Sequence, residues 1–464
     1  MEKLRIHSFF ILILTITSSI SFSNSAFAQI KKSKVNYVPG ELIIRVKDGS
    51  ITQASNGIKQ MSLAQTNAWL SEIGALSSTP IFRNKPKALS KMGISKQAFS
   101  RKSRLERYLK ININPDEPIE QMIQKFKNHP NVEYVEPNYI YHALATTNDP
   151  KIDDLWGFNN IGQTGGNFDS DIDLFEAWEI ETGSASTVVA VIDDGVDFNH
   201  EDLADNIWQN VKEIPDNGID DDGNGYVDDL RGWDFITEGN DPTPLDGQSH
   251  GTHVAGTIGA VGNNGIGVVG VAQNVQIMPL EVDLSTSQIV EAIHYAVDNG
   301  AKIINASWGG SNSETINEAI KYAADHDVLF IAAAGNGEPT WVGLEQKNIG
   351  IDNDSSPTAI YPASHDNENI LAVAATDHND ELAEFSNYGH TSVDVAAPGT
   401  NILSSVPGDE YESYGGTSMA TPITAGLAAL IYSQDPSLSA IEIKQRIMDS
   451  VDQIDSLQGK LVTG

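Results

Sequence analysis

The chain has 464 residues, 40% of them hydrophobic, and a formal net charge of -34. This length and apolar content allow a large core and more than one domain. The charge is uneven, since residues 29–144 hold 18 basic and 9 acidic side chains, whereas residues 145–464 hold 9 basic and 53 acidic ones. The acidic segment would repel phosphates, which argues against nucleic-acid binding. The opposite charges of the two segments suggest that the basic one docks on the acidic one.

The first residues have the pattern of a targeting segment. Lys3 and Arg5 precede an apolar run at 9–16, which is too short to span a bilayer, and Ala26-Phe27-Ala28 follows as a cleavage site. We therefore expect a signal peptide at 1–28, with an uncleaved anchor as the alternative, and a secreted, extracellular protein that is free of the membrane once the signal is removed. Because the chain has no cysteine, bound metal is one remaining way to stabilise its loops.

Residues 29–144 predict a small α+β unit. It comprises a helix at 118–127 and strands at 39–47, 107–113 and 132–136, while residues 50–102 show little periodicity.

From residue 148 onward, apolar runs alternate with helical spacing at 287–298 and 314–325. Such runs are typical of parallel strands buried on both faces, and they lie at 188–192, 277–282, 303–306, 328–334 and 370–374. The sequence therefore predicts an α/β domain with a mostly parallel sheet.

Four polar positions stand where these strands end or where helices begin. Asp193 follows the first strand, Asn336 follows the strand at 328–334, and His250 opens a helix of small residues. Ser418 follows the glycine pair 415–416 at the start of an apolar helix, where a hydroxyl could also serve merely as a cap. Because the carboxyl ends of parallel strands line one crevice, we expect an Asp-His-Ser triad for acyl transfer, with an Asn amide for the oxyanion.

Four segments resemble the signatures of the subtilisin family of serine proteases, in the family's order Asp, His, Ser. They are Val189–Gly195, His250–Gly256, Ala333–Asn336 and Gly416–Pro422. The resemblance implies a three-layer α/β subtilisin-like fold at 145–464, preceded by a signal at 1–28 and a small α+β inhibitory and chaperone propeptide at 29–144. The family usually continues with a closing segment, which leaves open a domain truncated at its C-terminus.

The same resemblance implies roles for single residues. Asp193, His250 and Ser418 would form the triad, and Asn336 would complete the oxyanion hole. Substrate would bind in extended form along two segments, Ser307-Trp308-Gly309 and Ala333-Ala334-Gly335. Cleavage after Leu144 would release the propeptide, which acts until then as an intramolecular inhibitor.

Two calcium sites are expected. In the acidic loop at 220–229, oxygen-bearing residues alternate as in a calcium loop, and the alternative is a solvated acidic loop; the ligands would be Asp220, Asp222, Asn224, Tyr226 and Asp228. The second site follows from the resemblance alone. Its ligands would be Asp149, Asp202, Asn264 and the carbonyl groups of Gly262, Ile266 and Val268.

Two other functions stay open. Asp194, directly after Asp193, also occurs in kexin-like convertases, where it helps to select basic residues. A catalytically dead, calcium-dependent binding protein on the same scaffold is the alternative from another class. We expect a monomeric serine endopeptidase that acts on proteins or peptides, with calcium as its cofactor.

Overall fold

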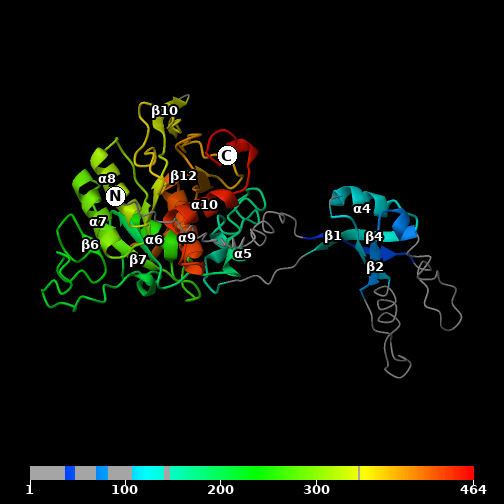
Figure 1. The fold of residues 1–464 in the computed structure, drawn as a ribbon, viewed down its shortest axis with the longest axis horizontal. Coiled ribbons are helices and arrows are strands. Elements are labelled where there is room, and N and C mark those ends of the chain that lie inside the picture. Colours follow the sequence, from blue (N-terminus) through cyan, green and yellow to red (C-terminus); the bar gives the residue numbers. More distant parts are fainter. Residues whose placement is uncertain are drawn as a thin grey trace, which may run out of the picture. The chain divides into compact units, whose positions relative to one another are not determined.

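The computed structural model describes residues 37–47, 69–81, 107–115, 117–139, 147–342 and 345–463. The chain divides into two compact units, 1–143 and 144–464, which we describe separately (Figure 1). The predicted signal peptide at 1–28 and the predicted cleavage point after Leu144 lie outside the described residues.

The smaller unit contains a four-stranded antiparallel sheet with one helix packed on it. The strand order is β2-β3-β1-β4, and the helix α4 (Ile119–Lys127) buries Met122 and Phe126 in the core of the unit. The strands are β1 (Tyr37–Val46), β2 (Ser77–Pro80), β3 (Tyr108–Asn112) and β4 (Val132–Tyr139). The expected elements are present, but β2 and a short helical turn at 69–72 lie in a region that lacked periodicity.

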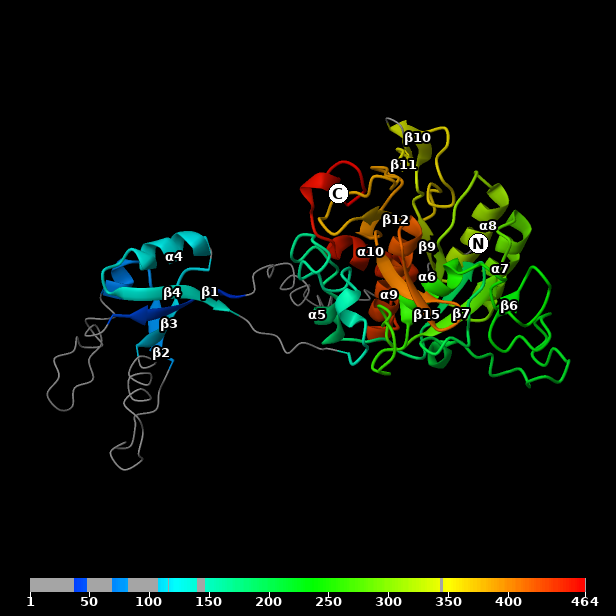
Figure 2. The same cartoon turned by 180° about the vertical axis from the view of Figure 1, so that it is seen from behind.

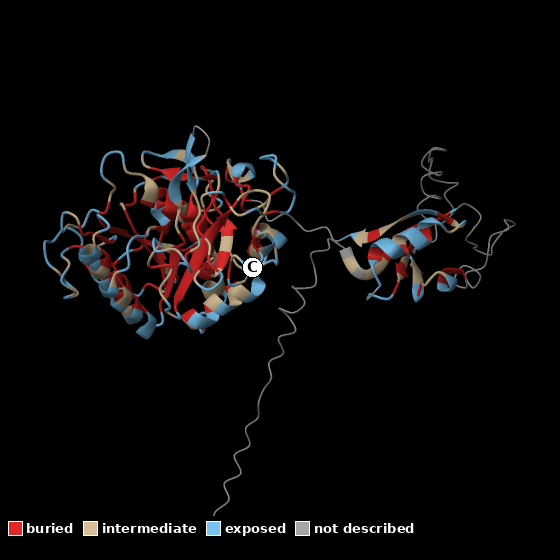
Figure 3. Ribbon diagram, turned by 90° about the horizontal axis from the view of Figure 1, so that it is seen from above, coloured by how far each residue is buried: buried red, intermediate tan, exposed pale blue. Residues whose placement is uncertain are grey.

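The larger unit is built around a seven-stranded parallel sheet in the order β13-β12-β9-β8-β5-β7-β6. Its strands are β5 (Val188–Asp193), β6 (Trp233–Asp234), β7 (Gln276–Glu281), β8 (Ile303–Ala306), β9 (Leu329–Ala333), β12 (Ile370–Thr376) and β13 (Val395–Pro398). Strands β8, β9 and β12 are buried along their whole length, and β5 along all but its first residue, as continuous apolar runs predict (Figure 3).

Helices cover both faces of this sheet. Alternate residues of β5 point to opposite faces, so Val189 and Val191 join one core with α6 (His250–Gly259), α9 (Thr417–Gln434) and α10 (Ala440–Ser450). Ala190 and Ile192 join the other core with α7 (Thr286–Asp298) and α8 (Glu314–Asp325). The predicted three-layer α/β architecture is confirmed.

Smaller elements complete the unit. Two hairpins lie outside the main sheet: β10 (Glu338–Val342) with β11 (Glu345–Ile349), and β14 (Ile402–Val406) with β15 (Glu410–Tyr414). The remaining helices are α5 (Leu174–Trp178), η2 (Ile152–Asp154), η3 (Ala204–Asn206) and η4 (Asp455–Leu457). Among the described residues we find no helix with the length and apolar character needed to cross a membrane.

Candidate active site

The expected acid and base lie in direct contact. Asp193 is the last residue of β5 and His250 is the first residue of α6. Asp193 Oδ1 accepts a hydrogen bond from His250 Nδ1 at 2.8 Å and another from the backbone N–H of Asp194 at 2.9 Å. Because Nδ1 carries the proton toward the carboxylate, the neutral imidazole has its lone pair on Nε2, where a general base needs it.

The carboxylate also changes the acidity of this imidazole. Burial lowers the pKa of His250, but the charge and hydrogen bond of Asp193, with a smaller contribution from Asp194, outweigh it and raise the pKa to about 9. A protonated His250 is therefore stabilised at this position, as the step that takes a proton from serine requires.

Ser418 is the second residue of α9 and makes a reciprocal pair of hydrogen bonds with Ser307, just beyond β8. Ser418 Oγ donates to the Ser307 carbonyl oxygen at 2.9 Å, and Ser307 Oγ donates to the Ser418 carbonyl oxygen at 2.8 Å. A hydroxyl has only one proton to donate. The Ser418 hydroxyl must therefore turn away from the Ser307 carbonyl oxygen before it can donate to His250.

Asn336 is held with its amide nitrogen available. Its Oδ1 accepts from the backbone N–H and the hydroxyl of Thr417, so Nδ2 points away from these donors. A Cβ atom at position 416 would lie 3.3 Å from this Nδ2, so Gly416 leaves the space beside the amide open. The arrangement leaves an N–H donor beside the first turn of α9, where an oxyanion could form.

Asn387 fixes the backbone on both sides of the β10–β11 hairpin that follows Asn336. Its Oδ1 accepts from the N–H of Gly337 at 2.9 Å and of Ile351 at 3.0 Å. The side chain of Trp341 near the hairpin tip is largely exposed, at 70%.

Asp194 caps the helix that carries His250. Its carboxylate accepts from the backbone N–H of Gly251 at 2.6 Å and, more weakly, of His250 at 3.3 Å. Burial and the adjacent Asp193 raise its pKa. Both of its oxygens therefore face the N-terminus of α6, which favours negative charge.

The expected substrate segments lie at the ends of β8 and β9. Trp308 and Gly309 line a cavity of about 310 Å³, together with Leu284, Ile289 and Ile316. Trp308 Nε1 donates to the Ile192 carbonyl oxygen at 2.8 Å. Ala333 and Ala334 are buried at the end of β9, and Gly335 adopts a positive φ of 109°.

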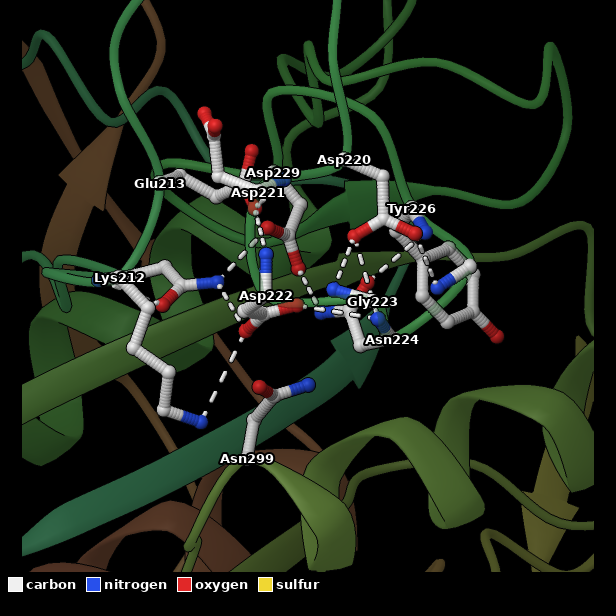
Figure 4. Close-up of polar contacts among 12 residues, drawn as sticks. Lys212, Glu213, Asp220, Asp221, Asp222, Gly223, Asn224, Tyr226, Asp229 and Asn299 are labelled. Atoms are coloured by element: carbon white, nitrogen blue, oxygen red, sulfur yellow. Dashed lines mark hydrogen bonds and ion pairs between the residues drawn. The ribbon is translucent and has the colours of Figure 1, made fainter.

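Part of the acidic loop forms a cluster of oxygen ligands (Figure 4). Asp220 and Asp222 each have a carboxylate oxygen within 4.8 Å of the other's and of one on Glu213. Asn224 Oδ1 accepts from the N–H of Tyr226 within the same loop. The Asp228 carboxylate accepts from the N–H groups of residues 217 and 218 at 3.1 and 2.8 Å and lies outside the cluster of three.

Glu213 is the ligand candidate that the sequence did not reveal. It lies seven residues before Asp220, outside the alternating pattern, and only 5% of it is exposed. Its Oε1 accepts from the N–H of Asp221 and Asp222, and its Oε2 from that of Asp228. Glu213 is distinguished by its nearly complete burial, and a sequence pattern does not show the burial of a single polar residue.

The second expected calcium site is assembled from distant segments. Asp149 and Asp202 are buried, and Asn264 contacts both, through its N–H to Asp149 Oδ1 and its Nδ2 to Asp202 Oδ1. The loop at 262–268 closes around them, since Val268 donates its N–H to Asp202 Oδ2 at 2.9 Å and Asn264 Oδ1 accepts from Ile266. Carboxylate and amide oxygens are ligands that suit calcium, although Asn264 turns its amide nitrogen toward Asp202 in this arrangement.

A carboxylate-bound imidazole and a helix-borne serine, at one edge of a parallel sheet, are the groups that a serine hydrolase requires. Residues 184–461 match the model of the subtilase family. The chain belongs to this family, and its enzyme class is that of the serine endopeptidases, as the named relatives also indicate.

Several characterised proteins are similar to it. A thermophilic serine proteinase of Bacillus sp. (strain AK1) is 37% identical over 351 residues, which cover 74% of each chain. Thermitase of Thermoactinomyces vulgaris is 38% identical over 60% of this chain and 85% of its own length. A protease structure from Pseudoalteromonas arctica shares 29% identity, with a TM-score of 0.51, over 67% of this chain and 93% of that one. The chain spans 41% of the length of subtilisin-like protease 1 of Plasmodium falciparum.

Proposed function

We propose that this chain is the precursor of a secreted, calcium-stabilised serine endopeptidase that first cleaves its own N-terminal segment. The observation that carries the proposal is the 2.8 Å hydrogen bond from His250 Nδ1 to Asp193. It leaves Nε2 as a base, with Ser418 at the start of a helix packed in the same core as α6.

In the proposed reaction, His250 Nε2 takes the proton of Ser418 Oγ as that oxygen attacks the peptide carbonyl carbon. Asp193 stabilises the imidazolium, and the Asn336 amide and the Ser418 backbone N–H bind the oxyanion. His250 then protonates the leaving amine, which gives an acyl-enzyme. A water molecule, deprotonated by the same imidazole, hydrolyses the ester.

Substrate would pair its backbone with the segment at 307–309, and one of its side chains would enter the cavity beside Trp308. The first substrate would be the segment at 29–144, cut after Leu144 and inhibitory until released. Removal of residues 1–28 would accompany secretion. Relatives named extracellular proteases, one from Xanthomonas campestris and a halolysin-like one from Natrialba magadii, support this location.

Calcium would stabilise the loops of a protein without disulfide bonds. Asp149, Asp202 and Asn264 would hold one ion with the carbonyl groups of 262, 266 and 268. Glu213, Asp220 and Asp222 would hold a second ion. The buried or clustered oxygen atoms at both places fit the ion. Asp228, which lies outside the cluster of three, would order the loop through its bonds to the N–H groups of residues 217 and 218. We propose a monomer as the active form.

The alternatives have less support. The carboxylate of Asp194 already caps α6, which argues against the role that a kexin-like preference for basic residues would give it. A dead binding protein would have no need of the Asp193–His250 bond or of the constrained Asn336 amide.

The decisive test compares the wild type with Ser418→Ala, both expressed with calcium in a host that lacks other subtilases. N-terminal sequencing and intact mass should show a wild type that starts at Ala145 and a variant still joined to residues 29–144. A processed Ser418→Ala variant would refute the assignment of the nucleophile. If both proteins stay uncut, although circular dichroism shows that both are folded, the non-catalytic alternative is favoured.

A further inference from the structure

A hydrogen bond joins the two segments that carry the proposed base and nucleophile. Ser249 Oγ lies 2.8 Å from Tyr414 Oη. Ser249 directly precedes His250, and Tyr414 precedes Ser418 by four residues, at the end of β15.

The direction of this bond follows from the next partner along. Tyr414 Oη also lies 3.1 Å from Glu412 Oε2. A carboxylate oxygen can only accept, so Tyr414 donates its single proton to Glu412 and Ser249 donates to Tyr414. The tyrosine hydroxyl therefore has both of its roles assigned, which restrains its position and that of Ser249.

The tyrosine ring is held as firmly as its hydroxyl. It stacks on His253 of α6, with 4.4 Å between ring centroids and 13° between planes. His253 is fully buried, and its Nε2 lies 2.9 and 3.1 Å from the carbonyl oxygens of Ile402 and Glu412, one on each strand of the β14–β15 hairpin.

Two serines of β14 bind the same hairpin to α6. Ser404 Oγ donates to the His253 carbonyl oxygen at 2.7 Å, and Ser405 Oγ donates to that of Thr252 at 3.2 Å. The hairpin and the first turns of α6 therefore form one hydrogen-bonded body, with β15 close to α6 (Figure 2).

The hydrogen bonds of the two catalytic groups lead in different directions, so this connection adds to the packing of α6 on α9. His250 is bound to Asp193 on β5, whereas Ser418 is bound to Ser307 beyond β8. Only Gly415, Gly416 and Thr417 separate Tyr414 from Ser418, so a displacement of Tyr414 acts on the segment that carries the nucleophile. The bond from Ser249 fixes the Tyr414 end of this segment, and the bonds from Thr417 to Asn336 hold its other end.

We propose that Tyr414 and Ser249 are positioning residues that fix the separation of the His250 imidazole from Ser418. The inference rests on the proposed triad and adds a determinant of its geometry. Loss of the bond should slow proton transfer from Ser418, because small displacements of reacting groups are costly in rate, while the binding of substrate stays unchanged.

The test measures kcat and KM on a peptide substrate, together with the rate of inactivation by an organophosphorus fluoridate, which reacts with an activated serine. We expect kcat and the maximal inactivation rate of Tyr414→Phe to fall about tenfold at constant KM. Ser249→Ala should behave alike, and the double variant should be no slower than the slower single one, since one bond is lost in all three. Ser249→Thr, which keeps a hydroxyl, should retain most of the rate.

Tyr322→Phe is the matched control, because it removes a tyrosine hydroxyl that bonds Asp298 on the protein surface. An unchanged kcat in Tyr414→Phe and Ser249→Ala, whether or not their melting temperature falls, would overturn the inference, as would a change confined to KM. Should Tyr414→Phe fail to fold, Ser249→Ala decides alone. If the wild type does not react with the fluoridate, or Ser418→Ala reacts equally, the proposed function itself fails.

Discussion

The amide oxygen of Asn336 accepts two hydrogen bonds from Thr417, one from its backbone N–H at 2.8 Å and one from its hydroxyl at 2.9 Å. The Thr417 hydroxyl in turn accepts from the N–H of Gly335 at 3.2 Å. The side chain next to the nucleophile therefore decides which way the amide faces, and a single residue connects the end of β9 to the start of α9.

Asn336→Asp should separate the acceptor role of this side chain from its donor role. The aspartate keeps an oxygen for Thr417 but replaces the N–H donor by a second oxygen, which would repel an oxyanion. We expect kcat to fall by about 10²- to 10³-fold, with a small change in KM and in melting temperature. Steady-state kinetics on a peptide substrate would show this, and a near-normal kcat would remove Asn336 from the oxyanion hole.

The pH dependence should reveal the Asp193–His250 pair. With a pKa of about 9, His250 is neutral only above that pH, so kcat/KM should rise as the pH increases toward it. Because folding raises the pKa of His250, its protonation stabilises the folded state. This contribution to the free energy of unfolding is fully present below pH 6.5 and is lost as the pH rises through about 9. An NMR titration of His250 in Ser418→Ala would give the midpoint directly, and Asp193→Asn should move it to lower pH. A midpoint below 6.5 would contradict this assignment.

Removal of calcium should lower the melting temperature, because an ion that binds only the folded state stabilises it by about 2.7 kcal/mol at 100 times its dissociation constant. Glu213→Gln should weaken calcium binding in titration calorimetry if Glu213 is a ligand. Glu179→Gln, the same change at an exposed residue, serves as the control. Identical melting curves with and without excess chelator would contradict the calcium proposal.

Tyr295 anchors the acidic loop to α7. Its hydroxyl donates to Asp229 Oδ2 at 2.6 Å, and Asp229 is fully buried, which raises its pKa. Tyr295→Phe removes one hydrogen-bond donor from this carboxylate. The free energy of unfolding measured in denaturant should therefore fall by about 1–3 kcal/mol. Tyr322→Phe at the surface should change stability by less than about 0.5 kcal/mol. Equal stabilities for the two variants would show that the buried bond contributes little.

The parts of the fold that the sequence predicted are those with strong local signals. The apolar run at 188–192 became β5 at Val188–Asp193, and the helix expected at 314–325 is α8 with the same bounds. Two-residue β6 and the short β13 have too few residues to show periodicity. The hairpin at 402–414 contains two adjacent serines in β14 rather than an apolar run, and bonds to α6 hold it in place.

The candidate site likewise contains some residues that could be predicted from the sequence and others that could not. Asp193 and His250 could be predicted because each stands at the end of a recognisable element. The roles of Ser249 and Tyr414 could not, since they depend on a contact between residues 165 positions apart. Glu213 was missed for a related reason, because a candidate ligand outside a repeating pattern has no local signal.

Asn387, which binds the backbone on both sides of the β10–β11 hairpin, has a consequence for how this enzyme can vary. Both anchoring bonds lie outside the hairpin, so a change in its length or tip leaves the two ends and Asn336 where they are. The hairpin, with the exposed Trp341 near its tip, can therefore be exchanged or lengthened without displacing Asn336.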